Sequence, residues 1–155
     1  MYMSADLIGR FKVIYALQMK FPNWKITSMP LYSKYDLEVY DENNSKMYIE
    51  VKDRWNEKDK YPTAFLNKEK FSDAEAIADN WFYANVYTDG EIVLWKPYDI
   101  PAENIGKETK MIAVSTVEKG EKKMQERLCL RFDDCCSAFT NNLKIIKYDD
   151  EERDS

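Results

Sequence analysis

The sequence contains no histidine in its 155 residues. Catalysis by Ser-His-Asp or Cys-His groups and catalysis by histidine-bound zinc all need an imidazole, so these reaction classes are excluded. Cysteine is scarce as well: Cys129, Cys135 and Cys136 are an odd number without the spacing of a zinc site, and we expect reduced thiols. The side chains left for catalysis are carboxylates, lysines, hydroxyls and thiols.

Glycine is limited to four residues, and no Gly-rich loop that could hold the phosphates of a nucleotide is present. No apolar run approaches the ~18 residues of a membrane span, and the first residues, MYMSADLIGRFKV, lack the pattern of a secretory signal. We therefore expect a soluble, cytoplasmic protein without membrane contact. A chain of this length corresponds to one domain, which we place at residues 1–148.

The net charge of −5 is unevenly distributed along the chain. Residues 149–154, DDEERD, carry five acidic side chains and one basic one, and we predict that 149–155 form a disordered acidic tail. Between residues 46 and 70, seven basic residues stand against five acidic ones. Because phosphate neutralisation drives most nucleic-acid binding, this local excess permits a phosphate-containing ligand without requiring one.

A helix over residues 5–21 is predicted near the N-terminus. Ser4 is a suitable N-cap, Leu7, Phe11, Ile14 and Phe21 recur at helical spacing, and Pro22 ends the pattern. A strand at 24–29 follows and ends at Pro30.

Residues 35–52 form a predicted β-hairpin whose turn lies at the polar cluster 41–45. Alternation along the two strands places one set of side chains on an apolar face: Leu37, Val39, Met47, Ile49 and Val51. It places a second set on the opposite face, away from the core: Asp36, Glu38, Tyr48, Glu50 and Lys52. With the turn centred near residue 43, Asp36 lies opposite Glu50, and Glu38 lies opposite Tyr48.

The rest of the chain predicts further α and β elements. We expect a loop at 53–65, a second helix at 67–79, and a buried hairpin with strands at 81–87 and 91–95 around an Asp-Gly turn. A third hairpin is expected with strands at 111–117 and 126–132, followed by a short helix or extension at 133–146. One group of aromatic side chains is better explained as sheet core than as a binding surface: Trp81, Phe82, Tyr83, Tyr87 and Trp95.

The facing pair Asp36 and Glu50 suggests a metal site. Like charges on facing positions of a hairpin are destabilising unless something compensates them, and a divalent cation does so directly. Mg²⁺ is typically held by one or two carboxylates together with water and phosphate oxygens. Lys52 lies two residues beyond Glu50 on the same face, within reach of a water or phosphate beside such an ion.

Tyr35-Asp36, thirteen intervening residues and Glu50-Val51-Lys52 resemble the D…(D/E)xK signature of the PD-(D/E)XK nuclease superfamily, which has the restriction-endonuclease-like fold. The order of the expected elements over about residues 5–95 is similar to its αβββαβ core. The resemblance implies an α/β protein with a central mixed sheet flanked by helices, and the third hairpin would be an extra C-terminal one. It also implies hydrolysis of phosphodiester bonds in DNA, RNA not being excluded, with Mg²⁺ (or Mn²⁺) as cofactor.

By the same resemblance, Asp36 and Glu50 are metal ligands and Lys52 is the catalytic lysine. Asp6, in the first helix, corresponds to an additional acidic residue of many relatives, although it is more simply a helix-start acid. Lys68 and Lys70 lie where relatives place polar residues that contact substrate, although solvated surface lysines explain them too.

Other interpretations remain open from the sequence. Solvated strand faces commonly carry Glu and Lys as cross-strand pairs, and a protein of this fold can act as a catalytically inactive module that binds nucleic acid or protein. Arg54 could contact phosphate, and Trp55 could either stack on a base or pack in the core. The weak overall basicity suggests that a homodimer or a partner protein supplies part of the grip on the substrate.

Overall fold

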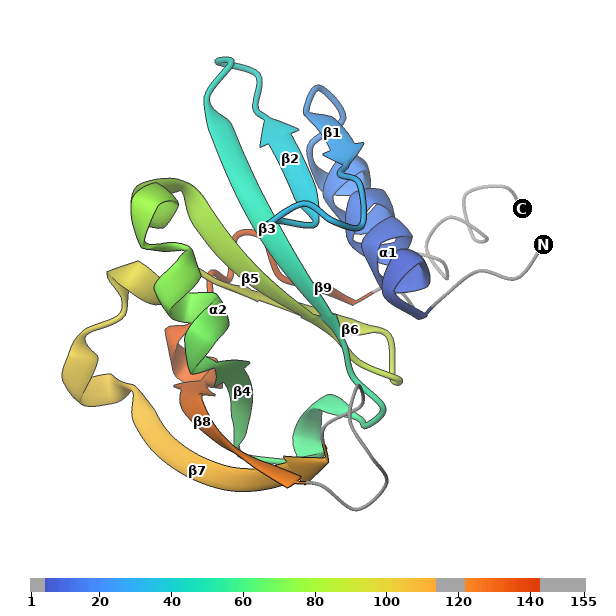
Figure 1. Cartoon of the computed structure of the whole chain (residues 1–155). Helices are drawn as coiled ribbons and strands as arrows, with labels where there is room; N and C mark the ends of the chain where they lie inside the picture. Colours follow the sequence, from blue (N-terminus) through green and yellow to red (C-terminus); the bar gives the residue numbers. More distant parts are fainter. Residues whose placement is uncertain (1–4, 114–121, 143–155) are drawn as a thin grey trace.

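The computed structural model describes residues 5–113 and 122–142. These residues form an α/β fold with two sheets, one long helix and several short helical turns (Figure 1). The strands are β1 Lys25–Ser28, β2 Leu37–Tyr40, β3 Lys46–Asp53, β4 Thr63–Asn67, β5 Trp81–Val86, β6 Glu91–Trp95, β7 Gly106–Ala113, β8 Lys122–Arg131 and β9 Asn141–Asn142. The α-helices are α1 Ala5–Lys20 and α2 Lys68–Asp73, and 3-10 turns cover Lys58–Lys60, Glu75–Asn80, Pro97–Asp99, Ala102–Asn104 and Phe132–Asp134.

The central sheet has six strands in the order β1-β2-β3-β5-β6-β9 and is mixed, as predicted. All its neighbouring strands pair antiparallel except β3 and β5, which run parallel. The hairpin register is also as predicted, with Glu38 opposite Tyr48. The β5–β6 hairpin turns at Asp89-Gly90, where Gly90 adopts a φ of 87° that glycine tolerates without strain.

Helix α1 covers one face of this sheet (Figure 1). Val13, Ala16 and Leu17 are fully buried against Leu37, Ile49 and other apolar strand residues. Gly9 lies close to β3, where an added Cβ would be in van der Waals contact with the Cβ of Asp53 at 3.4 Å. The predicted apolar stripe is wrong at Phe11, which is 48% exposed; Val13 and Ala16 are buried instead, together with Leu17.

The opposite face of the central sheet is covered as well, by the three-stranded sheet β4-β8-β7 and by α2 (Figure 1). A second core forms there from residues of both sheets: Ala64, Leu66, Ala74, Trp81, Tyr83, Tyr87, Val93, Trp95, Leu128 and Leu130. The prediction that one face of the hairpin points away from any core is therefore wrong for part of that face, since Tyr48 packs against this second core. The aromatic residues predicted as sheet core, including Phe82 on the α1 side, are all buried.

Between residues 53 and 80, two elements of the structure differ from the predicted ones. The expected loop at 53–65 contains the 3-10 turn Lys58–Lys60 and the start of β4, which pairs with β8 and so depends on a partner far along the chain. The expected helix at 67–79 divides into α2 and the 3-10 turn Glu75–Asn80, where Ile77 has non-helical angles of φ −120° and ψ 24°. The αβββαβ order holds for α1, β1, β2, β3, α2 and β5, with β4 inserted before α2.

The third predicted hairpin corresponds to β7 and β8, which pair antiparallel with Gly106 opposite Cys129 and Ala113 opposite Lys122. Its strands begin earlier than predicted, and the end of the first predicted strand, 114–117, lies outside the described residues together with 118–121. The region predicted as a short helix or extension includes the end of the 3-10 turn Phe132–Asp134 and the two-residue strand β9. The predicted acidic tail at 149–155 lies outside the described residues. Within the described part of the chain, none of the helices combines the length and apolarity needed to cross a bilayer.

Candidate active site

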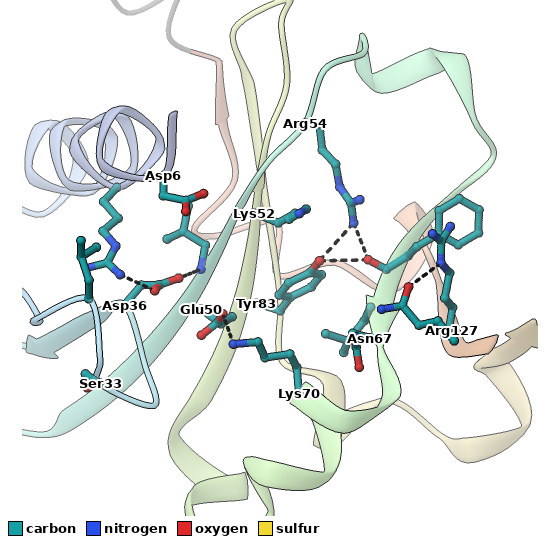
Figure 2. A pocket seen from close by; sticks show the side chains of 16 residues that line it. Asp6, Ser33, Asp36, Glu50, Lys52, Arg54, Asn67, Lys70, Tyr83 and Arg127 are labelled. Atoms are coloured by element: carbon teal, nitrogen blue, oxygen red, sulfur yellow. Dashed lines mark hydrogen bonds and ion pairs between the residues drawn. The ribbon is translucent and has the colours of Figure 1, made fainter. Parts of the chain in front are cut away.

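Asp36 lies immediately before β2, and its carboxylate is fixed by two neighbours (Figure 2). Its Oδ1 accepts a hydrogen bond from the Arg10 guanidinium at 2.6 Å, and its Oδ2 accepts one from the backbone N–H of Val51 at 2.7 Å. An ionised carboxylate has about four lone-pair positions. Asp36 is therefore held in one orientation while retaining acceptor capacity for a further ligand.

Glu50 lies on β3 and continues the hairpin register toward Asp36. Its side chain is only 12% exposed, and its Oε1 lies 3.4 Å from the Nζ of Lys70 on α2. Burial and, second, the charge of Asp36 raise the pKa of Glu50 to about 7, against the lowering effect of Lys70. The two carboxylates thus interact electrostatically, as the predicted pairing requires.

A cavity of about 510 Å³ brings these groups together between α1, the hairpin and the second sheet. Asp6, Asp36, Glu50 and Lys52 all line it, and Figure 2 shows Lys52 projecting from β3 beside Glu50 and Tyr83. Five basic side chains line the cavity against three acidic ones: Arg10, Lys52, Arg54, Lys70 and Arg127 against Asp6, Asp36 and Glu50. The net positive lining contrasts with the net charge of −5 of the whole chain.

Among the other predicted substrate contacts, Lys70 and Arg54 line the cavity and Lys68 does not. Lys70 reaches the cavity through its ion pair with Glu50, whereas Lys68 lies outside it and pairs with Glu126 at 2.8 Å on the surface. Arg54 lines the cavity, but its guanidinium also donates to Asn85 Oδ1 at 2.5 Å, to Tyr83 Oη at 3.0 Å and to the carbonyl of Phe65. Trp55 is 89% exposed, so the interpretation that it packs in the core is wrong.

Sequence reasoning missed Arg10 as part of the site. Arg10 is 4% exposed and also donates to the carbonyl of Met29 at 2.6 Å. The signal was present, because Arg10 lies three and seven residues before Val13 and Leu17 and so shares their buried helix face. A charged residue on a buried stripe requires a charged partner, and Asp36 is that partner.

The second sheet supplies further cavity residues that the sequence did not indicate. Asn67 at the end of β4 and Gln125 and Arg127 on β8 line the wall opposite Asp36. Arg127 donates to Gln125 at 3.1 Å, and its guanidinium lies 5.2 Å from the centre of the Phe65 ring. Their placement depends on the pairing of β4 with β8, which local patterns do not encode.

The donor set fits a hard divalent cation. Asp36 and Glu50 offer oxygen ligands, and burial together with the charge of Asp36 raises the pKa of Glu50, so a bound cation would relieve the cost of ionising both carboxylates. No group of three or more metal-binding side chains gathers within residues 5–113 and 122–142. Two carboxylates suit Mg²⁺ or Mn²⁺, because such ions usually keep several water ligands. Asp6 lines the same cavity and stays a candidate for an additional ligand.

Comparison with known proteins supports this assignment of the fold. Residues 8–94, from α1 to β6, match the family model described as "Phage putative PDDEXK endonuclease". No curated protein and no solved structure gives a match. The match covers more than half of the chain and includes Asp36, Glu50 and Lys52. The chain therefore belongs to the phage PDDEXK endonuclease family, within the PD-(D/E)XK superfamily of nucleases.

Proposed function

We propose that the protein hydrolyses phosphodiester bonds in DNA with the help of Mg²⁺ or Mn²⁺, which Asp36 and Glu50 hold. The observation that carries this proposal is the meeting of Asp36, Glu50 and Lys52 in one positively lined cavity. The spacing of these residues resembles the D…(D/E)xK signature. When bound, the cation would supply Lewis-acid activation of water and stabilisation of phosphate charge.

Residues of the chain have separate roles in the proposed reaction. Arg10 and the Val51 N–H orient Asp36, and Lys70 balances the charge of Glu50. The ammonium of Lys52 orients the attacking water by hydrogen bonding, or stabilises the negative charge that develops on the phosphate. The walls of the cavity reduce contact with bulk solvent, which strengthens these charge interactions.

A second function is favoured by a specific observation, namely that each carboxylate already has a cationic neighbour. Arg10 lies 2.6 Å from Asp36, and Lys70 lies 3.4 Å from Glu50. These pairs compensate the carboxylates without a metal ion, as expected of a catalytically inactive module of nuclease fold that binds nucleic acid or protein. The two functions differ in whether bound nucleic acid is cut.

The test is a cleavage assay with plasmid DNA, single-stranded DNA and RNA in the presence of Mg²⁺ or Mn²⁺. We expect wild-type protein to cut DNA, and Lys52→Ala to lose the activity by about 100-fold or more, because a positioned group of this kind contributes roughly 10²–10⁴-fold. The matched control is Lys25→Ala, which removes an exposed lysine on β1 outside the cavity.

Loss of activity in Lys52→Ala with full activity in Lys25→Ala supports the nuclease. An unchanged rate in Lys52→Ala contradicts the proposed role of this lysine. Binding of DNA by wild-type protein without cleavage under either metal ion supports the inactive module instead.

The kind of nucleic acid, the cellular location and the oligomeric state are further parts of the proposal. DNA is the proposed substrate, and the RNA arm of the assay tests the alternative. We also propose that the protein acts in the cytoplasm and that a homodimer or a partner protein contributes to substrate binding. Gel filtration of the free and DNA-bound protein tests for the homodimer.

A further inference from the structure

A second hollow adjoins the cavity on the side of the β4-β8-β7 sheet. It has a volume of about 240 Å³ and shares three lining residues with the cavity, Arg54, Phe65 and Arg127. Figure 2 shows Arg54 and Arg127 on the side of the cavity away from Asp36. The two spaces are therefore neighbours, and the shared residues lie between the cavity of the paired carboxylates and the hollow beside the second sheet.

The charge of this hollow is of one sign. Four basic residues line it, Arg54, Lys58, Lys110 and Arg127, and no acidic residue of the described chain does. Lys110 on β7 is exposed, and Lys58 belongs to the 3-10 turn that precedes β4. Several positive charges spread over one hollow of an acidic chain favour an extended anion over a small one.

Aromatic rings accompany these charges. Tyr61 is 45% exposed and lines the hollow together with Phe65, whose ring lies 5.2 Å from the Arg127 guanidinium. Cationic grooves with accessible aromatic rings are typical of sites for single-stranded nucleic acid, where phosphates meet the charges and bases stack on the rings.

We infer that this hollow binds one single strand of nucleic acid whose backbone continues into the cavity of Asp36 and Glu50. The inference rests on the proposed nuclease function, whose substrate it narrows to a single strand or a single-stranded segment. Lys58, Lys110 and Arg127 contact the phosphates, and the ring of Tyr61 stacks on a base.

The test measures binding separately from cleavage. Fluorescence anisotropy with a labelled 20-nucleotide single-stranded DNA, in EDTA, compares the wild-type chain with Lys58→Gln/Lys110→Gln. We expect the double variant to bind roughly threefold to thirtyfold more weakly, as the loss of two charge contacts implies, one from the exposed Lys110 and one from the half-buried Lys58. The slope of log K against log salt should fall in magnitude by about 1.4, since each phosphate contact on a single strand contributes ~0.7.

The control variant is Lys12→Gln/Lys25→Gln, which makes the same change of charge at exposed positions on α1 and β1. Equal weakening in both double variants overturns the inference, because it would show an effect of net charge alone. Failure of wild-type protein to bind the single strand overturns it as well. Tyr61→Ala should weaken binding by about fivefold or more while Tyr61→Phe binds normally, since the ring stacks rather than the hydroxyl.

A duplex of the same sequence distinguishes the kind of nucleic acid. Weaker binding of the duplex than of the single strand supports the inference, whereas tighter duplex binding that depends on Lys58 and Lys110 overturns the single-strand assignment. Specific single-strand binding with no cleavage under Mg²⁺ or Mn²⁺ refutes the nuclease proposal and leaves the strand site established. Cleavage by a protein that binds the strand equally well with and without Lys58 and Lys110 refutes the strand site and supports the nuclease proposal.

Discussion

At the scale of single residues, Glu50 shows how the site is held at a cost to stability. Burial and the neighbouring Asp36 raise its pKa to about 7, so the folded protein holds a proton that the unfolded chain releases near pH 4.5. A group whose pKa is raised on folding contributes stability at low pH that is lost as pH rises through the folded pKa. The ionised site at pH 8 is therefore under electrostatic strain.

This strain predicts a pH-dependent effect of Glu50→Gln in metal-free protein. The variant should be more stable than wild type by up to about 3 kcal/mol at pH 8, and of similar stability at pH 4.5, because the amide carries no charge to desolvate. Urea denaturation at the two pH values measures this difference. Addition of Mg²⁺ at pH 8 should raise the stability of wild type but not of the variant.

Glu103→Gln is the control for that experiment, since Glu103 is exposed. It should leave the stability unchanged at both pH values. Equal stability of wild type and Glu50→Gln across the pH range would contradict the electrostatic account of the site.

At the scale of elements, Arg54 links the end of β3 to β5 in the central sheet and to β4 in the second sheet. It follows β3 directly and donates to Asn85 and Tyr83 on β5 and to the carbonyl of Phe65 on β4. Asn85 and Tyr83 are buried, so their oxygen atoms lack alternative partners in water. The guanidinium of Arg54 therefore adds polar contacts between the two sheets to the apolar packing of the second core.

Arg54→Ala should lower the free energy of unfolding by about 2–4 kcal/mol, because it leaves several buried acceptors without a charged donor. Urea denaturation monitored by tryptophan fluorescence measures the loss. Arg131→Ala provides the control: Arg131 is half exposed and pairs with Asp134 at 3.0 Å, so its removal should cost under about 1 kcal/mol. Similar losses in the two variants would show that Arg54 does not join the sheets.

Local pattern explains why the hairpin and its register were predictable from the sequence. The alternation of Leu37 and Val39 with polar residues, and the turn cluster after Tyr40, act over a few residues. The pairing of β4 with β8 instead joins Thr63 to Arg131, and no local feature of TAFLN specifies so distant a partner. Asp36 and Glu50 were therefore predictable as facing residues, whereas Arg127 and the cavity wall that it occupies were not.

At the scale of the whole molecule, acidic and basic charges are segregated. The chain has a net charge of −5, and residues 149–154 carry most of it, with five acidic side chains and one basic one. The cavity and the adjoining hollow are each lined by more basic than acidic residues. The basic residues of the cavity and hollow would attract a polyanion, and the negative net charge of the whole chain would oppose this attraction.

Replacement of the five acidic residues in 149–154 by their amides should tighten binding of single-stranded DNA at low salt. The effect should be several-fold at 0.01 M salt, where the Debye length is about 30 Å, and absent at 1 M, where it is about 3 Å. Anisotropy titrations across this range measure it. Tightening that persists at 1 M salt would contradict a long-range electrostatic cause.

The ion pair between Arg10 and Asp36 has a consequence for the timing of activity during folding. Its partners are 26 residues apart and lie on α1 and just before β2, so the carboxylate is oriented only once the helix has docked on the sheet. Detachment of α1 removes the Arg10 contact and leaves Asp36 held by the Val51 N–H alone. The proposed activity should therefore appear late in folding, after α1 has docked on the sheet.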